Sequence, residues 1–469
     1  MWRRAVAASA LWASAAGCGI PSALVPRGAS DGGTGGGDAR ADAGGGDAAS
    51  FSDAGGDAAA GSDADAGLPL LPADVLVNSD TAGDQREPAV DGDTFDGRFV
   101  VAWTGPNAVG GRNVRFTALD TAGAPVPGFP TPEPLGLGCP GCTTVVSEPS
   151  VAVHAYQGRI LLGGLRDGGA GGARVRAWNG DGSSANGERN VLCGAAMDAG
   201  PALDAIPWDA TMPAPGGGDV GYYAALSREV GLIDDEVHLR ALQYDGDDGA
   251  SCNPLPLATG IGPYDLFAGV PSALVVGVAA PVAGYFAGSN FRGARPGLWG
   301  PTVLAPDAPT AGMSVCATSD LVVVAWVDAG ALTVGAWSGG APLAPAAAVA
   351  PATAPSLSPP IVAVAFSASC TAAVAAWEDG AIDGASGGAG IAGLLFDLDA
   401  FGGVIPRANP VDGAAAPFAV ATTTAGDQAE PAVAVLPDGT FLVVWTDHGL
   451  NPGDVDGDAV RARAFPAVL

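Results

Sequence analysis

Two nearly identical stretches, TAGDQREPAV at residues 81–90 and TAGDQAEPAV at residues 424–433, decide how this chain folds. Each is followed by a turn that contains Asp-Gly and then by an aliphatic run that ends in Trp, at Trp103 and Trp445. A loop rich in Gly and Asp comes next, and then an alternating strand such as residues 460–465. This order predicts a repeating unit of strand, hairpin, strand, loop and strand.

Weaker copies of the unit fill the chain between the two clear ones. Their aliphatic runs and closing strands lie at residues 148–178, 222–244, 274–299, 321–337 and 371–396. The 342 residues from Trp103 to Trp445 therefore hold six steps of about 57 residues. Each step is long enough for four short strands, and a fixed period of this kind is typical of propellers and solenoids.

The chain also carries a strand that belongs to no unit. Residues 70–78 read as a strand before the first unit, and residues 417–421 hold the matching place before the last. A ring needs an N-terminal strand to complete its final sheet, whereas a solenoid needs capping units. We therefore expect an all-β fold, a seven-bladed β-propeller over residues 71–469; rings of six or eight blades and tandem β-sandwiches are the alternatives. The tryptophans expected to pack between blades are Trp103, Trp326, Trp377 and Trp445.

The first 18 residues predict export. Arg3 and Arg4 precede an apolar run of about a dozen residues, which is too short to span a bilayer and has the form of a signal peptide. The run leads into Ala-Ala-Gly-Cys at residues 15–18, which resembles the lipobox of bacterial lipoproteins, with Ala where Leu is commonest. The resemblance implies that residues 1–17 are removed and that Cys18 is acylated. An ordinary cleaved signal and a twin-arginine signal are the alternatives.

The segment after the cysteine, residues 18–70, consists almost entirely of Gly, Ala, Asp and Ser. Such a segment cannot bury enough apolar surface to offset its ordering entropy. We expect a disordered acidic linker that holds the folded domain away from a membrane. Because Gly19 follows the cysteine in place of Asp, the lipoprotein resemblance implies anchoring in the outer membrane of the cell envelope, facing the periplasm or the cell surface.

The repeat itself, with Glu-Pro-Ala-Val, then Asp-Gly, then Val-Val-Trp, resembles the repeats of propeller lipoproteins of the bacterial cell envelope, especially those of myxobacteria. The likeness is clear in two units and degraded in the others. No Trp-Asp closes each unit, and no Ser-x-Asp-x-Gly-x-x-Trp box is present, so the repeats differ from those of WD-repeat proteins and sialidases. Propellers have many unrelated functions, so this fold alone does not define one.

Charge and composition exclude some classes of function. The net charge is −29, and all 20 basic residues are Arg, so nucleic acid is not an expected partner. Only three His are present, at His154, His238 and His448, in unrelated surroundings. Catalysis or zinc binding by histidines therefore has little support, and no catalytic residue is identified.

Six cysteines remain without Cys18, an even number in an exported chain, which predicts disulfides. Two pairs lie about one repeat apart, and each could join neighbouring blades. These pairs are Cys193 with Cys252 and Cys316 with Cys370. The Cys-Pro-Gly-Cys run at residues 139–142 lacks a following helix and is interpreted as structural, not redox-active.

One acidic loop is a candidate metal site. Asp454, Asp456 and Asp458 alternate around Gly457, a spacing that lets a turn direct several oxygens at a hard cation. Calcium is the cation this donor set suits, with backbone carbonyls completing the shell. The alternative is a solvated loop, since Asp outnumbers Glu by 41 to 8 in this chain. No other cofactor is expected.

These observations favour a membrane-tethered binding or scaffold protein that is not an enzyme and that recognises a protein or a glycan through the loops of the ring. The alternative is a hydrolase or lyase that acts on polysaccharide. That alternative requires two or three acidic or Tyr side chains that meet at the axis of the ring.

Overall fold

The structure is a computed structural model. It describes residues 71–79, 82–130, 135–138, 143–153, 158–166, 172–185, 187–190, the strands given below between 202 and 338, 341–343, 346–351, 362–367, 369–382, 388–399, 402–449 and 457–466. The predicted signal peptide, Cys18 and the acidic linker lie outside the described residues.

The described residues form β-strands, turns and loops and contain no helix. None of them therefore belongs to a helix suited to crossing a membrane. The expectation of an all-β fold is confirmed.

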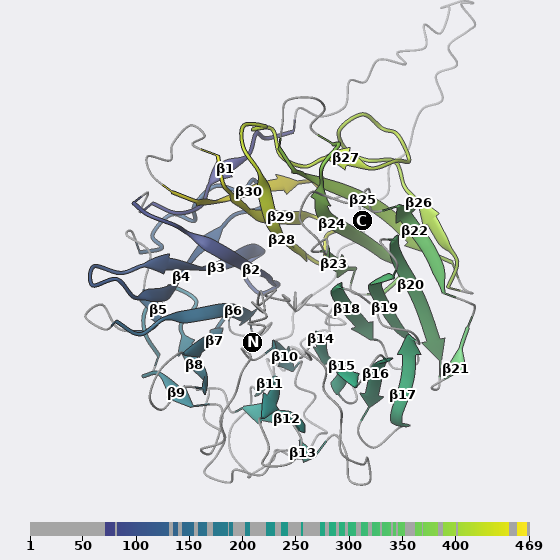
Figure 1. Ribbon diagram of the computed structural model, residues 1–469, viewed down its shortest axis with the longest axis horizontal. Helices are drawn as coiled ribbons and strands as arrows, with labels where there is room; N and C mark the ends of the chain where they lie inside the picture. The colour runs from purple at the N-terminus through teal and green to yellow at the C-terminus, as the bar shows by residue number, and fades with distance from the viewer. Residues whose placement is uncertain are drawn as a thin grey trace, which may run out of the picture.

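The strands of the described residues form seven antiparallel sheets. Six contain consecutive strands of the chain, and the last contains the three C-terminal strands with the N-terminal strand added at its edge. Figure 1 shows the sheets arranged around a common axis, with the first strand of each consecutive run nearest the axis. Five of the sheets, in chain order, contain the following strands. They are β2 (Arg86–Asp93), β3 (Arg98–Pro106), β4 (Arg112–Leu119) and β5 (Leu135–Leu137); β6 (Val146–Val153), β7 (Ile160–Arg166), β8 (Gly172–Trp178) and β9 (Arg189–Asn190); β10 (Ala202–Ile206), β11 (Tyr222–Glu229), β12 (Glu236–Leu242) and β13 (Leu255–Pro256); β14 (Ala273–Val276), β15 (Pro281–Ala287), β16 (Asn290–Arg295) and β17 (Trp299–Ala305); and β18 (Ala311–Ala317), β19 (Leu321–Asp328), β20 (Ala331–Ser338), β21 (Ala341–Pro342) and β22 (Ala347–Pro351).

The last two sheets carry the second clear copy of the repeat and the C-terminal end of the chain. They contain β23 (Val362–Phe366), β24 (Ala372–Asp379), β25 (Gly390–Leu398), β26 (Val404–Pro406) and β27 (Phe418–Ala419); and β28 (Gln428–Val435), β29 (Phe441–Asp447) and β30 (Ala459–Phe465), together with β1 (Val75–Leu76). The weaker units expected at residues 321–337 and 371–396 correspond to β19 with β20 and to β24 with β25.

The N-terminal strand completes the C-terminal sheet, as its place in the sequence predicted. β1 pairs antiparallel with β30, and Val75 lies opposite Ala462. The Asp74 carboxylate accepts hydrogen bonds from both hydroxyls and both backbone N–H groups of Thr422 and Thr423, at 2.6–3.2 Å. These bonds hold the pKa of Asp74 below its usual value, although burial opposes them. The N-terminal strand is therefore joined by backbone and side chain to the C-terminal sheet and to the segment that precedes it.

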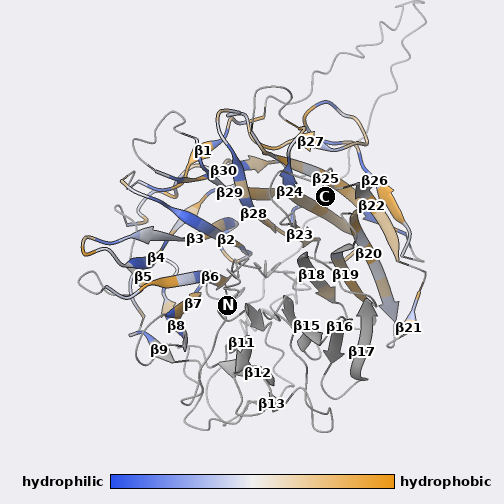
Figure 2. Ribbon diagram, viewed as in Figure 1, coloured by the Kyte–Doolittle hydropathy of each residue, from blue (hydrophilic) through white to orange (hydrophobic). Residues whose placement is uncertain are grey.

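The apolar core lies between sheets. Trp103, Trp377 and Trp445 are each 1 % exposed or less, and Trp326 is 4 % exposed. Trp103 packs among residues of its own sheet and of the C-terminal sheet, and Trp445 packs among residues of its own sheet and of the sheet that precedes it. Figure 2 shows hydrophobic strands such as β20 and β25 in these layers, whereas β2 is largely hydrophilic. The expectation that tryptophans form the core between sheets is confirmed for Trp103, Trp377 and Trp445. Trp326 is buried as well, and its ring lies beside that of Trp337 in the same sheet.

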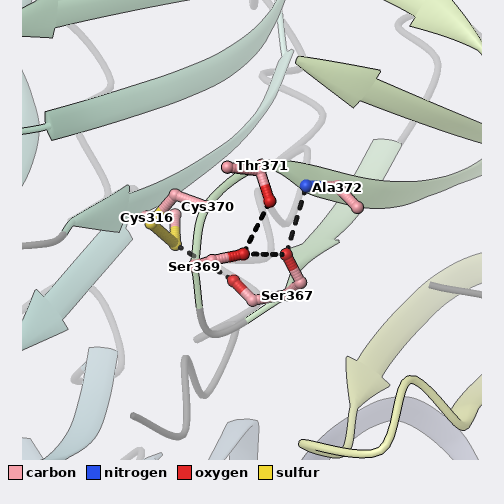
Figure 3. The surroundings of a disulfide bond; sticks show 6 residues. All are labelled: Cys316, Ser367, Ser369, Cys370, Thr371 and Ala372. Carbon is pink, nitrogen blue, oxygen red and sulfur yellow. Dashed lines mark hydrogen bonds between the residues drawn. A yellow bond between two sulfur atoms is a disulfide. The ribbon is translucent and has the colours of Figure 1, made fainter. Parts of the chain in front are cut away.

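A disulfide joins Cys316 at the end of β18 to Cys370 in the turn between β23 and β24. The bond therefore links two neighbouring sheets, as the spacing of the cysteines predicted (Figure 3). Both cysteines are buried. Hydroxyls of Ser367, Ser369 and Thr371 form a hydrogen-bonded row beside the bond. The other four cysteines expected in disulfides lie outside the described residues.

Candidate functional site

Three of the four glutamates of the candidate site share one local structure, a β-bulge at a Glu-Pro step. The bulges lie at the beginning of β28, β2 and β6, between Ala429 and Ala432 in the first case, and they contain Glu430, Glu87 and Glu148. The three glutamates have positive φ angles of 54°, 62° and 49°. A residue other than Gly rarely adopts this conformation, at a cost of roughly 1–3 kcal/mol. Strain of this kind persists only where surrounding contacts fix it.

Those contacts are carboxylates supplied by neighbouring sheets. The N–H of Glu430 donates to Oε1 of Glu378 at 2.9 Å. The N–H of Glu87 donates to Oε2 of Glu430 at 2.9 Å, and the N–H of Glu148 donates to Oε2 of Glu87 at 3.2 Å. Four glutamates from four consecutive sheets are thus linked head to tail, and we name this set the glutamate chain. Three of the four glutamates lie in β28, β2 and β6, which Figure 1 shows as the strands of their sheets nearest the axis.

Threonine hydroxyls complete the surroundings of two of these carboxylates. Thr446 donates to Oε2 of Glu430 at 2.7 Å, and Thr104 donates to Oε2 of Glu87 at 3.2 Å. The two threonines hold equivalent places, one residue after Trp445 and Trp103. Each carboxylate is therefore held by groups from two adjacent sheets.

Burial and mutual repulsion change the acidity of the glutamate chain. Burial raises the pKa of Glu378 to about 7, and the charge of Glu430 adds to this effect. Burial also raises the pKa of Glu87 above its usual value, again with a contribution from Glu430. Glu378 is only 2 % exposed, whereas Glu87, Glu148 and Glu430 are half-buried. The site therefore combines carboxyl groups of unequal acidity.

Composition singles out these positions. The chain contains 41 Asp and only 8 Glu, and half of the glutamates belong to the glutamate chain. The longer side chain reaches from one sheet to the backbone of the next, which Asp at the same position would not do. The selective use of Glu here follows from that reach.

A second polar cluster adjoins the glutamate chain where the C-terminal sheet meets the first sheet. Nδ1 of His448 and Oδ1 of Asp458 are hydrogen-bonded at 2.8 Å. The other carboxylate oxygen of Asp458 accepts a hydrogen bond from Nε of Arg86, and Nη2 of Arg86 also contacts Asp84 at 3.0 Å. The hydrogen bond that His448 donates to Asp458 raises the pKa of His448, although burial opposes it. His448 and Arg86 hold the pKa of Asp458 below its usual value against the effect of burial.

One of the three predicted calcium ligands, Asp458, belongs to this cluster. Asp458 is placed with its carboxylate between His448 and Arg86, while Asp454 and Asp456 lie outside the described residues. Within the described part of the chain, no group of three or more His, Cys, Asp or Glu side chains is arranged to hold a metal ion. Calcium binding by the loop remains a prediction.

Sequence reasoning missed the glutamate chain and the pairing of His448. The Glu-Pro step was visible as a repeated dipeptide, but its left-handed backbone and its neighbours in space were not. The signal that could have found it is the scarcity of Glu combined with its recurrence before Pro in three units.

Comparison with known proteins gives structural likeness only. No family model matches the chain, and no curated protein matches it. Among solved structures, a protein of unknown function from Dyadobacter fermentans is 12 % identical, with a TM-score of 0.45, over 85 % of this chain and 98 % of that one. A leech intramolecular trans-sialidase is 11 % identical, with a TM-score of 0.40, over 84 % of this chain and 70 % of that one. An ulvan lyase of polysaccharide lyase family 25 is 10 % identical, with a TM-score of 0.38, over 62 % and 75 %.

These findings correct the prediction that the chain is not an enzyme. The similar solved structures are mainly glycosidases, sialidases and polysaccharide lyases. The prediction had rested on the lack of any identifiable pair of carboxylates in the sequence. The fold brings the backbone of Glu87 and the carboxylate of Glu430 together from positions 343 residues apart, a contact that the sequence did not reveal.

Proposed function

We propose that this chain is an enzyme that cleaves glycosidic bonds of a polysaccharide, with Glu87 and Glu430 as its acid–base pair. The observation that carries the proposal is the hydrogen bond by which the Glu430 carboxylate accepts the backbone N–H of Glu87, together with the charge of Glu430 acting on the Glu87 carboxyl group, whose pKa is raised. Glycoside hydrolysis requires two carboxyl groups placed on either side of the bond that breaks.

The proposed chemistry divides the roles by pKa. Glu87, whose pKa is raised, carries a proton and donates it to the glycosidic oxygen as the bond from the anomeric carbon to that oxygen breaks. Glu430, held by Thr446, takes a proton from the water whose oxygen joins the anomeric carbon. One water molecule is consumed, and the two carboxyl groups exchange protonation states before the next cycle.

Charge limits the class of substrate. The chain carries a net charge of −29, so a strongly anionic polysaccharide would be repelled from most of its surface. We therefore expect a neutral polysaccharide or one that contains amino sugars.

The proposal also includes the shape and location of the enzyme. The seven sheets form a closed seven-bladed propeller, which the pairing of β1 with β30 and the contacts between first strands of neighbouring sheets support. An acylated Cys18 and the linker tether this domain to the outer membrane, where envelope or external glycans are within reach. Protease treatment of intact cells that releases residues 71–469 would place the domain on the cell surface, whereas protection until lysis would place it in the periplasm.

The test is an assay of reducing ends and of unsaturated products released from a panel of neutral, amino-sugar and uronate polysaccharides. The wild-type protein should release reducing ends from a neutral or amino-sugar polymer. E87Q and E430Q should each lower kcat by about 10²- to 10⁴-fold, the usual contribution of an acid–base group. E236Q, a matched Glu-to-Gln change on β12 in another sheet, is the control and should retain activity.

Three outcomes contradict the proposal. The first is no turnover of any polymer by wild type, the second is unchanged kcat in E87Q and E430Q, and the third is an equal loss in E236Q. Ultraviolet-absorbing unsaturated products from a uronate polymer would assign elimination in place of hydrolysis. Thermal unfolding of each variant separates lost chemistry from lost folding.

A further inference from the structure

The first member of the glutamate chain differs from the others. Glu378 is the second-last residue of β24, directly after Trp377, whereas Glu430, Glu87 and Glu148 lie in first strands. The residues that follow Trp103 and Trp445 in the corresponding strands are Thr104 and Thr446. A glutamate therefore stands at the place that threonine holds in those two sheets.

The glutamate at position 378 supplies an acceptor for a backbone N–H of the neighbouring sheet. The left-handed backbone of Glu87 places its N–H against Oε2 of Glu430 and, at 3.3 Å, against the hydroxyl of Thr446. The N–H of Glu430 also requires an acceptor, and this acceptor is Oε1 of Glu378 at 2.9 Å. Glu378 alone therefore accepts the N–H of Glu430, whereas Glu430 and Thr446 together accept the N–H of Glu87.

Glu378 is also placed where it cannot contact a substrate. Its exposure is 2 %, against half-buried positions for Glu430 and Glu87. A carboxyl group buried to this extent is retained only when its bonds have a function, because burial without a partner is costly.

We propose that Glu378 is a positioning residue, which fixes the backbone of Glu430 so that the Glu430 carboxylate faces both Glu87 and the substrate. This inference rests on the function proposed above. Because Glu378 accepts the N–H of Glu430, it fixes the strained conformation from which the Glu430 side chain projects. The ionisable groups that act on Glu378 are Glu430, His448 and Asp427, and the first and last of these raise its pKa while His448 lowers it.

Two substitutions at Glu378 distinguish its role as a hydrogen-bond acceptor from its role as a titrating charge. E378Q keeps an oxygen that can accept the N–H of Glu430 but removes the titrating group. E378T installs the residue found at the corresponding places in two other sheets. There the Thr446 hydroxyl lies 3.3 Å from the N–H of Glu87, so a Thr at 378 offers only a longer, uncharged contact in place of the 2.9 Å bond to the carboxylate. The matched control is T446S, which keeps a hydroxyl beside Glu430.

The experiment measures amide hydrogen exchange at Glu430 together with the pH dependence of polysaccharide cleavage, using the full chain. E378T should speed exchange of the Glu430 amide by about 10-fold or more, because a buried donor loses its 2.9 Å bond to a carboxylate. E378T should also lower kcat with little change in KM. E378Q should keep slow exchange and most of kcat, and its pH profile should lose the limb near neutral pH. T446S should resemble wild type in exchange.

Each outcome decides one question. If the Glu430 amide exchanges at the wild-type rate in E378T, or if E378Q loses as much activity as E378T, the positioning role is wrong. If wild type cleaves no polysaccharide, the proposed function fails, and the catalytic consequence fails with it. In that case the exchange rates still show whether Glu378 fixes Glu430, so the two failures are distinguishable.

Discussion

The two copies of the TAGDQ motif have the same backbone contacts and different side chains. In the first copy the N–H of Gln85 donates to the carbonyl of Asp458 at 2.8 Å, and in the second the N–H of Gln428 donates to the carbonyl of Ala389 at 2.7 Å. Both copies therefore bind a loop of the preceding sheet in the same way. The repeat thus specifies how each sheet meets the one before it.

The side chains at this contact distinguish the two interfaces. The first copy has Arg86 paired with Asp458, and the second has Ala429 and Ala389 at the corresponding positions. Similarly, Asn78 donates to Gln85 in the first interface, whereas Ala421 stands in its place in the second, where Oε1 of Gln428 has no partner among the described residues. An ion pair and an amide network have been added where the last sheet meets the first. The comparison shows that the repeat builds the ring, and that departures from it supply chemistry and closure.

The tryptophans test whether the two interfaces share one packing. W103A and W445A should each lower the free energy of unfolding by about 3–5 kcal/mol, because both side chains are fully buried. The two losses should agree within about 1 kcal/mol if the cores are equivalent. Urea denaturation measures both, and a cost for one variant less than half that of the other would show that the two cores differ.

Asn78 tests the closure of the ring. Its Oδ1 accepts the N–H of Val460 at 2.8 Å, and its Nδ2 donates to Gln85. N78A gives the first interface the residue that the second has, and it leaves a buried N–H without a partner. We expect a loss of about 1–3 kcal/mol in the free energy of unfolding. Unchanged stability would mean that β1 contributes nothing to closure.

The ion pair between Arg86 and Asp458 should contribute less to the free energy of unfolding than Asn78 does. Arg86 is 38 % exposed and Asp458 is 11 % exposed, so solvent screens part of their attraction. The coupling energy in a double-mutant cycle of R86A, D458A and R86A/D458A should be below about 1 kcal/mol. A coupling energy of several kcal/mol would mean that this ion pair, against expectation, contributes most of the stability of the interface between the last and first sheets.

The smallest expected effect is the response of stability to pH. Burial raises the pKa values of Asp91 and Glu378 to about 7, so both carboxyl groups bind more protons in the folded state than in the unfolded state between pH 4 and 7. Stability therefore falls as pH rises through this range. His448, whose pKa is also raised, contributes stability below its unfolded pKa that is lost as pH rises through the folded value.

All three groups act in the same direction. The Tm should rise by about 1–2 °C between pH 8 and pH 5.5. E378Q should reduce this rise, while D120N, on an exposed turn, should not. A Tm that falls on acidification over this range would contradict the assigned pKa directions.

Sequence reasoning recovered the framework because the repeat expresses it directly. The aliphatic runs that end in Trp103 and Trp445, the strand before the first unit, and the link from Cys316 to Cys370 all follow from periodicity and spacing. The site did not follow, because it depends on contacts between residues hundreds of positions apart. Glu430 meets Glu87 only after the ring brings the ends of the chain together. The backbone conformation that exposes each N–H to the next carboxylate has no sequence marker beyond Glu-Pro.

The central claim is that the glutamate chain contains carboxyl groups of unequal acidity at the axis. The most direct measurement is a carbon-13 NMR titration of protein labelled at the glutamate side-chain carboxyl, since the chain has only 8 Glu. We predict that Glu378 titrates near pH 7 and Glu87 above the usual range, and that E378Q and E87Q each remove one of these signals. If all glutamates titrate in the ordinary range of about 4–4.5, the glutamate chain is only a structural fastening, and the account of its chemistry is wrong.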